Sequence, residues 1–140
     1  MIYSLKNLLA EFKSPDLLEF IREQLTELLE IDNLNIGKIN EIAHTTHCFV
    51  DIHTNMNING IIVISCKSFL NDKKIFFVER IKSVEGDGFI EQKLMVEVLN
   101  SIGPVSKDDS VISLINDSRV QEEVLKPFGF FETTNILFKT

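Results

Sequence analysis

Residues 78–90, VERIKSVEGDGFI, are the most informative part of the chain, because they pass from a strand pattern into a helix pattern within one short stretch. Ile75 to Val84 is rich in strand-forming residues, and apolar residues recur at helical spacing from Phe89 onward. The Gly-rich turn between them, residues 85–88, exposes backbone N–H groups at a helix N-terminus. Such groups favour an anion such as a pyrophosphate. A plain structural turn is an equally good interpretation, since the turn contains no cationic residue.

Downstream of this turn, the sequence predicts alternating helices and strands. Ile90, Leu94, Val98 and Ile102 form an i, i+4 stripe that ends at a Gly-Pro pair, which stops the helix. The elements expected after it are a strand at Val111–Ile115, a helix at Ser118–Lys126 and a final strand at Phe131–Phe138. We expect the strand that ends near Val84 to pair in parallel with the strand Val111–Ile115, joined by a right-handed helical crossover.

Upstream of the turn, three β-rich segments predict an antiparallel meander. They cover Cys48–His53, Ile61–Phe69 and Ile75–Val84, and short polar stretches separate them. The middle segment is apolar on both of its alternating faces, which is typical of a central strand. We therefore expect helices to cover both sides of the sheet.

The N-terminal third is predicted to be helical. Ser14-Pro15-Asp16 suits a helix start, and leucine and isoleucine residues follow at helical spacing. A shorter helix is predicted at Ile36–Thr45.

Length and composition predict one soluble domain spanning residues 1–140. The chain is 44% hydrophobic and 25% charged, which is ordinary for a globular protein. Its net charge of −7 argues against nucleic-acid or anionic-membrane partners, which attract clustered cations. No signal peptide or membrane span is recognisable at the N-terminus, so we expect a cytoplasmic protein. The two cysteines, Cys48 and Cys66, are interpreted as buried thiols in a reducing compartment.

The order of elements resembles the Gcn5-related N-acetyltransferase (GNAT) superfamily, a mixed α/β fold. That family runs strand, two helices, three-stranded meander, helix, strand, helix, strand. The stretch VLKPFGF at residues 124–130 is similar to the end of the family's last helix, which commonly reads aromatic-x-x-x-Gly-Phe. Nearly the whole chain matches in order and length, and the resemblance implies that Met1–Leu9 is the first strand.

The resemblance implies an acetyl-CoA site at the strand–turn–helix junction. In the family, the strand before the turn splays from its neighbour and pairs with the pantetheine arm, and the turn receives the pyrophosphate. Transferred to this chain, the pantetheine contacts are Ile81, Lys82, Ser83 and Val84, and the pyrophosphate contacts are Gly86, Asp87, Gly88 and Phe89. In the register that keeps both glycines of the family turn, Ser83 stands in place of the family's cation, and the acidic Glu85 and Asp87 lie in the turn itself. Leu125 stands where a tyrosine often serves as general acid.

Acetyl transfer needs a neutral amine, so a base must remove a proton from the acceptor. Glu79 on the predicted central strand is the first candidate, and Asp51 on a neighbouring strand is the second. The alternative interpretation of each is an exposed strand charge. His44 and His47 are three residues apart, but without a carboxylate at an established ligand spacing we expect no metal site.

Two functions of different class remain open. The first is an acyl-CoA-dependent N-acetyltransferase acting on a small or peptidyl amine. The second is a non-catalytic binding or regulatory module of the same fold that has lost acetyl-CoA binding. The sequence leaves a homodimer open in either case.

Overall fold

The computed structural model of the chain describes residues 1–53, 55–68, 74–84, 88–102, 110–113, 130–133 and 136–139. The helices in this part are α1 (Leu5–Glu11), α2 (Pro15–Leu29), α3 (Ile36–Thr45) and α4 (Gly88–Ile102). The strands are β1 (Ile2–Ser4), β2 (His47–Ile52), β3 (Ile58–Ser68), β4 (Lys74–Ser83), β5 (Ser110–Ser113), β6 (Phe130–Thr133) and β7 (Ile136–Lys139). The helix predicted at Ser118–Lys126 lies outside the described residues.

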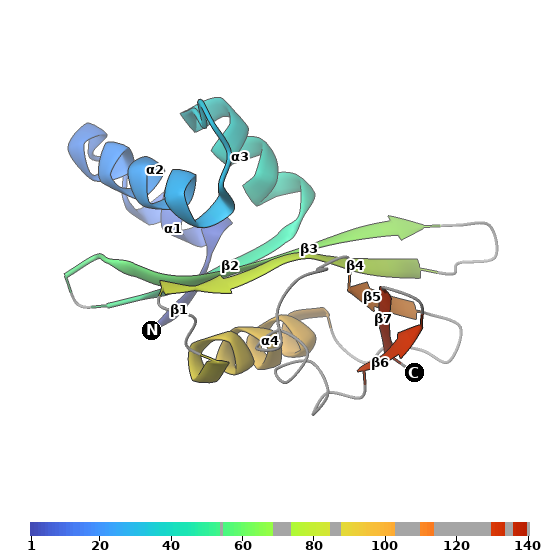
Figure 1. Cartoon of the computed structure of the whole chain (residues 1–140). Helices are drawn as coiled ribbons and strands as arrows, with labels where there is room; N and C mark the ends of the chain where they lie inside the picture. Colours follow the sequence, from blue (N-terminus) through green and yellow to red (C-terminus); the bar gives the residue numbers. More distant parts are fainter. Residues whose placement is uncertain are drawn as a thin grey trace.

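The described strands form one mixed sheet in the order β1-β2-β3-β4-β5-β7-β6. Strands β2, β3 and β4 form the predicted antiparallel meander. Strands β4 and β5 pair in parallel, as predicted, and α4 connects them on one face of the sheet (Figure 1). Helix α4 is therefore the crossover element between these two parallel strands.

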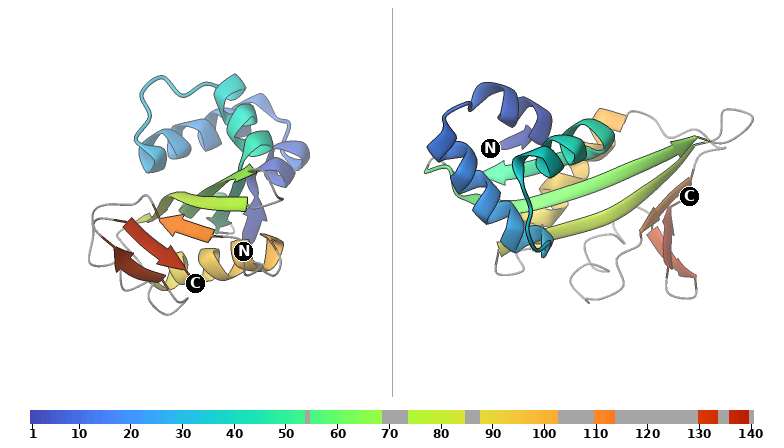
Figure 2. Two further views of the ribbon diagram at one scale, coloured as in Figure 1. Left: turned by 90° about the vertical axis from the view of Figure 1, so that its right-hand side faces the viewer. Right: turned by 90° about the horizontal axis from the view of Figure 1, so that it is seen from above.

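Helices cover both faces of the sheet, as the two-sided apolar pattern of β3 predicts. Helices α1, α2 and α3 lie on one face and α4 lies on the other (Figures 1 and 2). Ile61 and Val63 point into the core with α1, α2 and α3, whereas Ile62 and Ile64 point into the core with α4. Alternate side chains of a strand face opposite sides of the sheet, so β3 supplies both cores.

Gly60 allows α4 to lie close to the sheet. A Cβ atom at this position would lie 2.7 Å from Ile90 Cγ2, 3.0 Å from Leu94 Cδ1 and 3.2 Å from the backbone oxygen of Lys82. Real side chains do not tolerate the shortest of these contacts without a shift of their neighbours. The absence of a side chain at Gly60 therefore allows the close approach of α4 and the end of β4.

Local hydrogen bonds start the short N-terminal helices. Ser4 Oγ accepts a hydrogen bond from Asn7 N at 3.2 Å, and Asn35 Oδ1 accepts one from Lys38 N at 2.8 Å. Helix α2 begins with Pro15, as predicted, and Glu30 follows it in the left-handed conformation with φ 55°. This conformation reverses the chain between α2 and α3.

The structure differs from the sequence-based predictions at both ends of the chain. The strand expected within Met1–Leu9 is confined to β1, and α1 follows it at once. The single final strand expected at Phe131–Phe138 is instead two antiparallel strands, β6 and β7. Strand β7 pairs with β5 and so lies between β5 and β6 in the sheet.

The two cysteines differ in environment, which corrects the prediction that both are buried. Cys48 on β2 is buried, but Cys66 near the end of β3 is exposed, and both are free thiols. Burial raises the pKa of the Cys48 thiol to about 12, because the apolar surroundings disfavour the thiolate. None of the helices in the described part of the chain combines the length and apolar character needed to cross a bilayer.

Candidate active site

A β-bulge interrupts the pairing of β3 with β4 at Glu79. Ile64 lies opposite Val78 and Val63 lies opposite Arg80, so Glu79 is the extra residue of β4. A bulge bends its strand and redirects the side chains around it, and bulges are common beside active sites. The described pairing of β4 with β5 ends at the adjacent residue, Val78. The bulge thus lies where the described parallel ladder stops.

A cavity of about 320 Å³ lies beside this bulge, between β4 and the helices α2 and α3. Its apolar wall consists of Leu29, Ile31, Ile42 and Val63. Its polar lining consists of Lys38, Thr46, Glu79 and Arg80. The volume is near the lower end of the range for small-molecule sites, and an apolar wall with a few polar groups is typical of them.

Arg80 and Lys82 connect β4 to the end of α2. Arg80 Nη2 donates a hydrogen bond of 2.7 Å to the backbone oxygen of Leu29 and lies 3.8 Å from Glu30 Oε2. Lys82 Nζ lies 2.5 Å from Glu30 Oε1. These two cations hold the pKa of the Glu30 carboxyl below its ordinary value, and Lys82 has the larger effect. The contacts fix the position of the segment between α2 and α3, which forms one wall of the cavity.

Glu79, the first candidate base, lines this cavity with an exposed side chain. Among the described residues it forms no hydrogen bond or ion pair. Two cations, Lys38 and Arg80, line the same cavity, but neither is paired with Glu79 in the part of the chain that the structure describes.

Asp51, the second candidate, lies elsewhere. It is 5% exposed, and its Oδ1 lies 3.3 Å from the amino group of Met1. It pairs across the sheet with Gly60, whose missing Cβ would point at α4, so Asp51 faces α4 rather than the cavity. The structure therefore does not bring Asp51 and Glu79 together.

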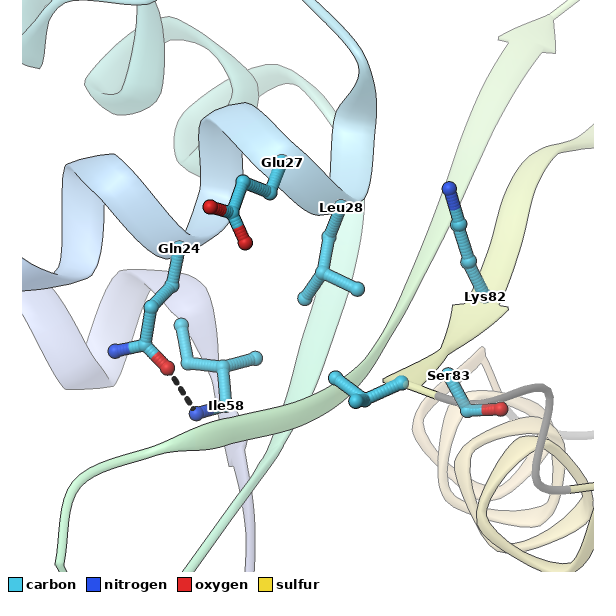
Figure 3. A pocket seen from close by; sticks show the side chains of 7 residues that line it. Gln24, Glu27, Leu28, Ile58, Lys82 and Ser83 are labelled. Atoms are coloured by element: carbon cyan, nitrogen blue, oxygen red, sulfur yellow. Dashed lines mark hydrogen bonds between the residues drawn. The ribbon is translucent and has the colours of Figure 1, made fainter.

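Three of the predicted cofactor contacts line a second cavity, of about 270 Å³, at the end of β4 (Figure 3). They are Lys82, Ser83 and Val84, and Gln24, Glu27, Leu28 and Ile58 complete the lining. The remaining predicted pantetheine contact, Ile81, is fully buried in the core beneath α4. Its side chain therefore packs in the protein interior, and only its backbone is in a position to contact a ligand at the sheet.

Gln24 fixes α2 against β3 at this second cavity. Its Oε1 accepts a hydrogen bond of 2.6 Å from Ile58 N, and its Nε2 donates one of 3.2 Å to the backbone oxygen of Met56 (Figure 3 shows the first). Both partners are backbone groups of the turn and strand that precede Gly60. The second half of α2, which lines both cavities, is therefore held to β3 by Gln24 and to β4 through the backbone of Leu29, its last residue.

At the start of α4, Gly88 is the first helical residue and the side chain of Phe89 is 69% exposed. Lys93 Nζ lies 5.2 Å from the centre of the Phe89 ring. The sequence reading overlooked this cation, which the helical spacing of residues 89 and 93 brings to the first turns of α4. The predicted contacts Gly86 and Asp87 lie outside the described residues.

Comparison with known proteins identifies similar folds. No protein-family model matches the sequence, and no curated protein does so either. Among solved structures, a GNAT-family acetyltransferase from Staphylococcus aureus is similar, with a TM-score of 0.61 and 15% identity over 99% of this chain and 97% of that one. A Trypanosoma brucei acetyltransferase has a TM-score of 0.61 and 17% identity over 86% of this chain and 89% of that one.

A third similar structure is Arabidopsis thaliana Naa50 in complex with the bisubstrate analogue CoA-Ac-MVNAL. Its TM-score is 0.59 at 15% identity, over 91% of this chain and 94% of that one. All three likenesses cover most of both chains, although the sequences are far apart. They confirm the mixed α/β fold predicted from the order of elements.

Proposed function

Since the chain has the fold of the GNAT acetyltransferases, we propose that it transfers an acetyl group from acetyl-CoA to a primary amine of a small molecule or peptide. The observation that carries this proposal is the position of Glu79. It is the extra residue of the β4 bulge, it lines a cavity of suitable size, and it has no ionic partner among the described residues. A carboxylate so placed suits the removal of a proton from an acceptor amine.

In this proposal the donor substrate lies along the end of β4 and reaches the start of α4. Residues 81–84 contact the pantetheine arm, and residues 86–89 offer backbone N–H groups to the pyrophosphate at the helix N-terminus. Lys93 adds a positive charge close to that terminus. The thioester then lies near the bulge, where the acceptor cavity opens beside the same strand.

The reaction is a direct transfer between the two substrates. Glu79 removes one proton from the acceptor ammonium, directly or through a water molecule. The neutral nitrogen then attacks the thioester carbonyl carbon, so that a C–N bond forms and the C–S bond breaks. The departing CoA thiolate and the newly acylated nitrogen exchange the remaining proton through solvent, which gives the N-acetyl product and CoA thiol.

The test combines binding with turnover. Calorimetric titration should detect acetyl-CoA binding, and mass spectrometry should detect acetylation in a panel of primary amines. Glu79→Gln should lower kcat about 10²- to 10⁴-fold while acetyl-CoA still binds, because only the base is lost. Glu11→Gln, an exposed change on α1, is the matched control and should leave kcat unchanged. Equal kcat for the wild type and Glu79→Gln would refute the role of Glu79.

The second candidate function is a non-catalytic module of the same fold. It is favoured by Glu85 and Asp87, which place negative charge in the turn that would receive the pyrophosphate. In that case calorimetry should show no binding of acetyl-CoA, and no amine should be acetylated. This outcome would replace the acetyltransferase proposal.

A further inference from the structure

We propose that the cavity beside Glu79 binds a free α-amino acid with an apolar side chain of about leucine's size. This inference deepens the proposed function, because it names the acceptor of the same site. It rests on three properties of the cavity: a carboxylate, two cations and an apolar wall, all in the lining of one small cavity. An apolar amino acid has the matching set of groups, namely an ammonium, a carboxylate and a hydrocarbon side chain.

The charges that face the cavity are separated rather than paired with one another. Glu79 forms no ion pair with either cation in the described structure. Lys38 pairs instead with Glu41 at 3.5 Å, and Arg80 lies near Glu30, but neither of these acids lines the cavity, and both side chains are 60% exposed. The cavity therefore offers one anionic group and two cationic groups between which a ligand can lie.

This arrangement disfavours a simple amine. An ammonium group near Glu79 also lies in the field of Lys38 and Arg80, whose like charge opposes it. A carboxylate on the same ligand offsets that repulsion, and a guanidinium such as that of Arg80 suits a carboxylate. One Arg80 nitrogen, Nη2, is already held by the backbone of Leu29, so the guanidinium is positioned before any ligand binds.

The apolar wall selects the side chain. Leu29, Ile31, Ile42 and Val63 supply hydrocarbon surface from α2, α3, β3 and the segment that links the two helices. A hydrocarbon side chain that covers this wall gains the usual free energy of apolar burial, which a polar side chain does not. The small volume, about 320 Å³, also limits the ligand to a compact molecule.

The test compares three ligands that differ only at the carboxylate: L-leucine, L-leucinamide and 3-methylbutylamine. Binding is measured by calorimetry and acetylation by mass spectrometry, both on the full chain. Wild-type protein should prefer leucine at least about tenfold over the other two in Kd and in kcat/KM. Lys38→Ala should reduce this preference by raising the Kd and KM for leucine, and it should leave 3-methylbutylamine unchanged or improved.

Lys13→Ala is the matched control, because it removes an exposed lysine that does not line the cavity, and it should keep the preference. Equal use of leucine and 3-methylbutylamine, with no effect of Lys38→Ala, would overturn the amino-acid proposal while acetyl transfer stands. Better use of leucinamide than leucine would point to a peptide N-terminus and also overturn it. Leucine binding that depends on Lys38, without acetylation of any amine, would support the ligand and refute the acetyltransferase.

Discussion

Glu79 and Arg80 are neighbours in the sequence, and both line the cavity between β4 and the helices α2 and α3. In a regular strand, consecutive side chains point to opposite faces of the sheet. The bulge at Glu79 removes this alternation, because two residues of β4 lie opposite one position of β3. It thereby places an anionic and a cationic side chain in one cavity.

Position 79 supplies both a carboxylate and the bend of β4, and substitution and deletion of Glu79 should separate these two roles. Deletion of Glu79 leaves Val78 and Arg80 opposite Ile64 and Val63, which restores a regular ladder. We expect Glu79→Ala to bind acetyl-CoA as the wild type does but to acetylate slowly. The deletion should also weaken acetyl-CoA binding at least about tenfold, because the bend of β4 is lost. Equal acetyl-CoA affinities in calorimetry for the two variants would show that the bulge does not position the donor.

Gly60→Ala should destabilise the protein. The new Cβ would lie 2.7 Å from Ile90 Cγ2 and 3.2 Å from a backbone oxygen, so α4 or β4 must move. Overpacking of this kind costs about 1–3 kcal/mol, which urea unfolding measures. Gly37→Ala is the control, since its Cβ would meet only Asn35 Oδ1 at 3.3 Å and alanine favours a helix. A smaller loss of unfolding free energy for Gly60→Ala than for Gly37→Ala would contradict the close approach of α4.

The contact of Glu30 with Lys82 and Arg80 should make stability depend on pH. Because the pKa of Glu30 in the folded chain lies below its ordinary value of 4.5, the stabilisation is complete above 4.5 and is lost as pH falls through the lower folded value. The urea midpoint of the wild type should therefore exceed that of Glu30→Gln at neutral pH. The difference should disappear in acid, and about 1 M salt should reduce it.

Glu19→Gln serves as the comparison for Glu30, since Glu19 pairs with Arg22 within α2 alone. We expect Glu30→Gln, but not Glu19→Gln, to change the KM of the acceptor, because Glu30, unlike Glu19, contacts β4 from the cavity wall. An unchanged acceptor KM in Glu30→Gln would show that Leu29 and Arg80 hold this wall without it.

The two thiols should react at very different rates. Cys66 is exposed, whereas burial of Cys48 keeps its thiol protonated by raising its pKa to about 12. A thiol-specific disulfide reagent should therefore modify one cysteine rapidly in the native protein and the second only after denaturant is added. Cys66→Ser should abolish the rapid phase. Rapid modification of Cys48 in that variant would mean that β2 opens readily.

The central part of the fold was predictable because its signals are local. The apolar run of β3 at residues 61–64 indicated a strand buried on both faces, and the structure confirms helices on each side. The Gly-rich turn and the stripe of α4 likewise predicted the parallel pairing of β4 with β5. In these segments one pattern extends over enough residues to favour a single interpretation.

The ends of the chain were harder to predict. Helix α1 has two turns, Leu5–Glu11, and so short an apolar pattern suits a strand equally well. The split into β6 and β7 had a weak signal, the polar Thr133-Thr134-Asn135 between two apolar groups, which the reading of a continuous strand overlooked.

The candidate site could be predicted only in part. Its residue type and its strand make Glu79 the first candidate, and the structure places it in the lining of a cavity. The bulge depends on the register between β3 and β4, and the cavity depends on where α2 and α3 lie, so neither follows from a local pattern. The same grounds make Asp51 a candidate, but its strand position faces α4 and the amino group of Met1.

The charge of the Gly-rich turn should limit the affinity for acetyl-CoA. Glu85 and Asp87 flank Gly86, where the family resemblance places the pyrophosphate, and like charges about 4 Å apart repel by about 4 kcal/mol at a surface-like dielectric before salt screening. Replacing Glu85 with Arg and Asp87 with Gly removes this repulsion and adds a cation. The double variant should bind acetyl-CoA more tightly in calorimetry, and added salt should reduce the gain because the gain is electrostatic. Equal affinities of the wild type and the double variant at low salt would show that these two side chains point away from the bound pyrophosphate.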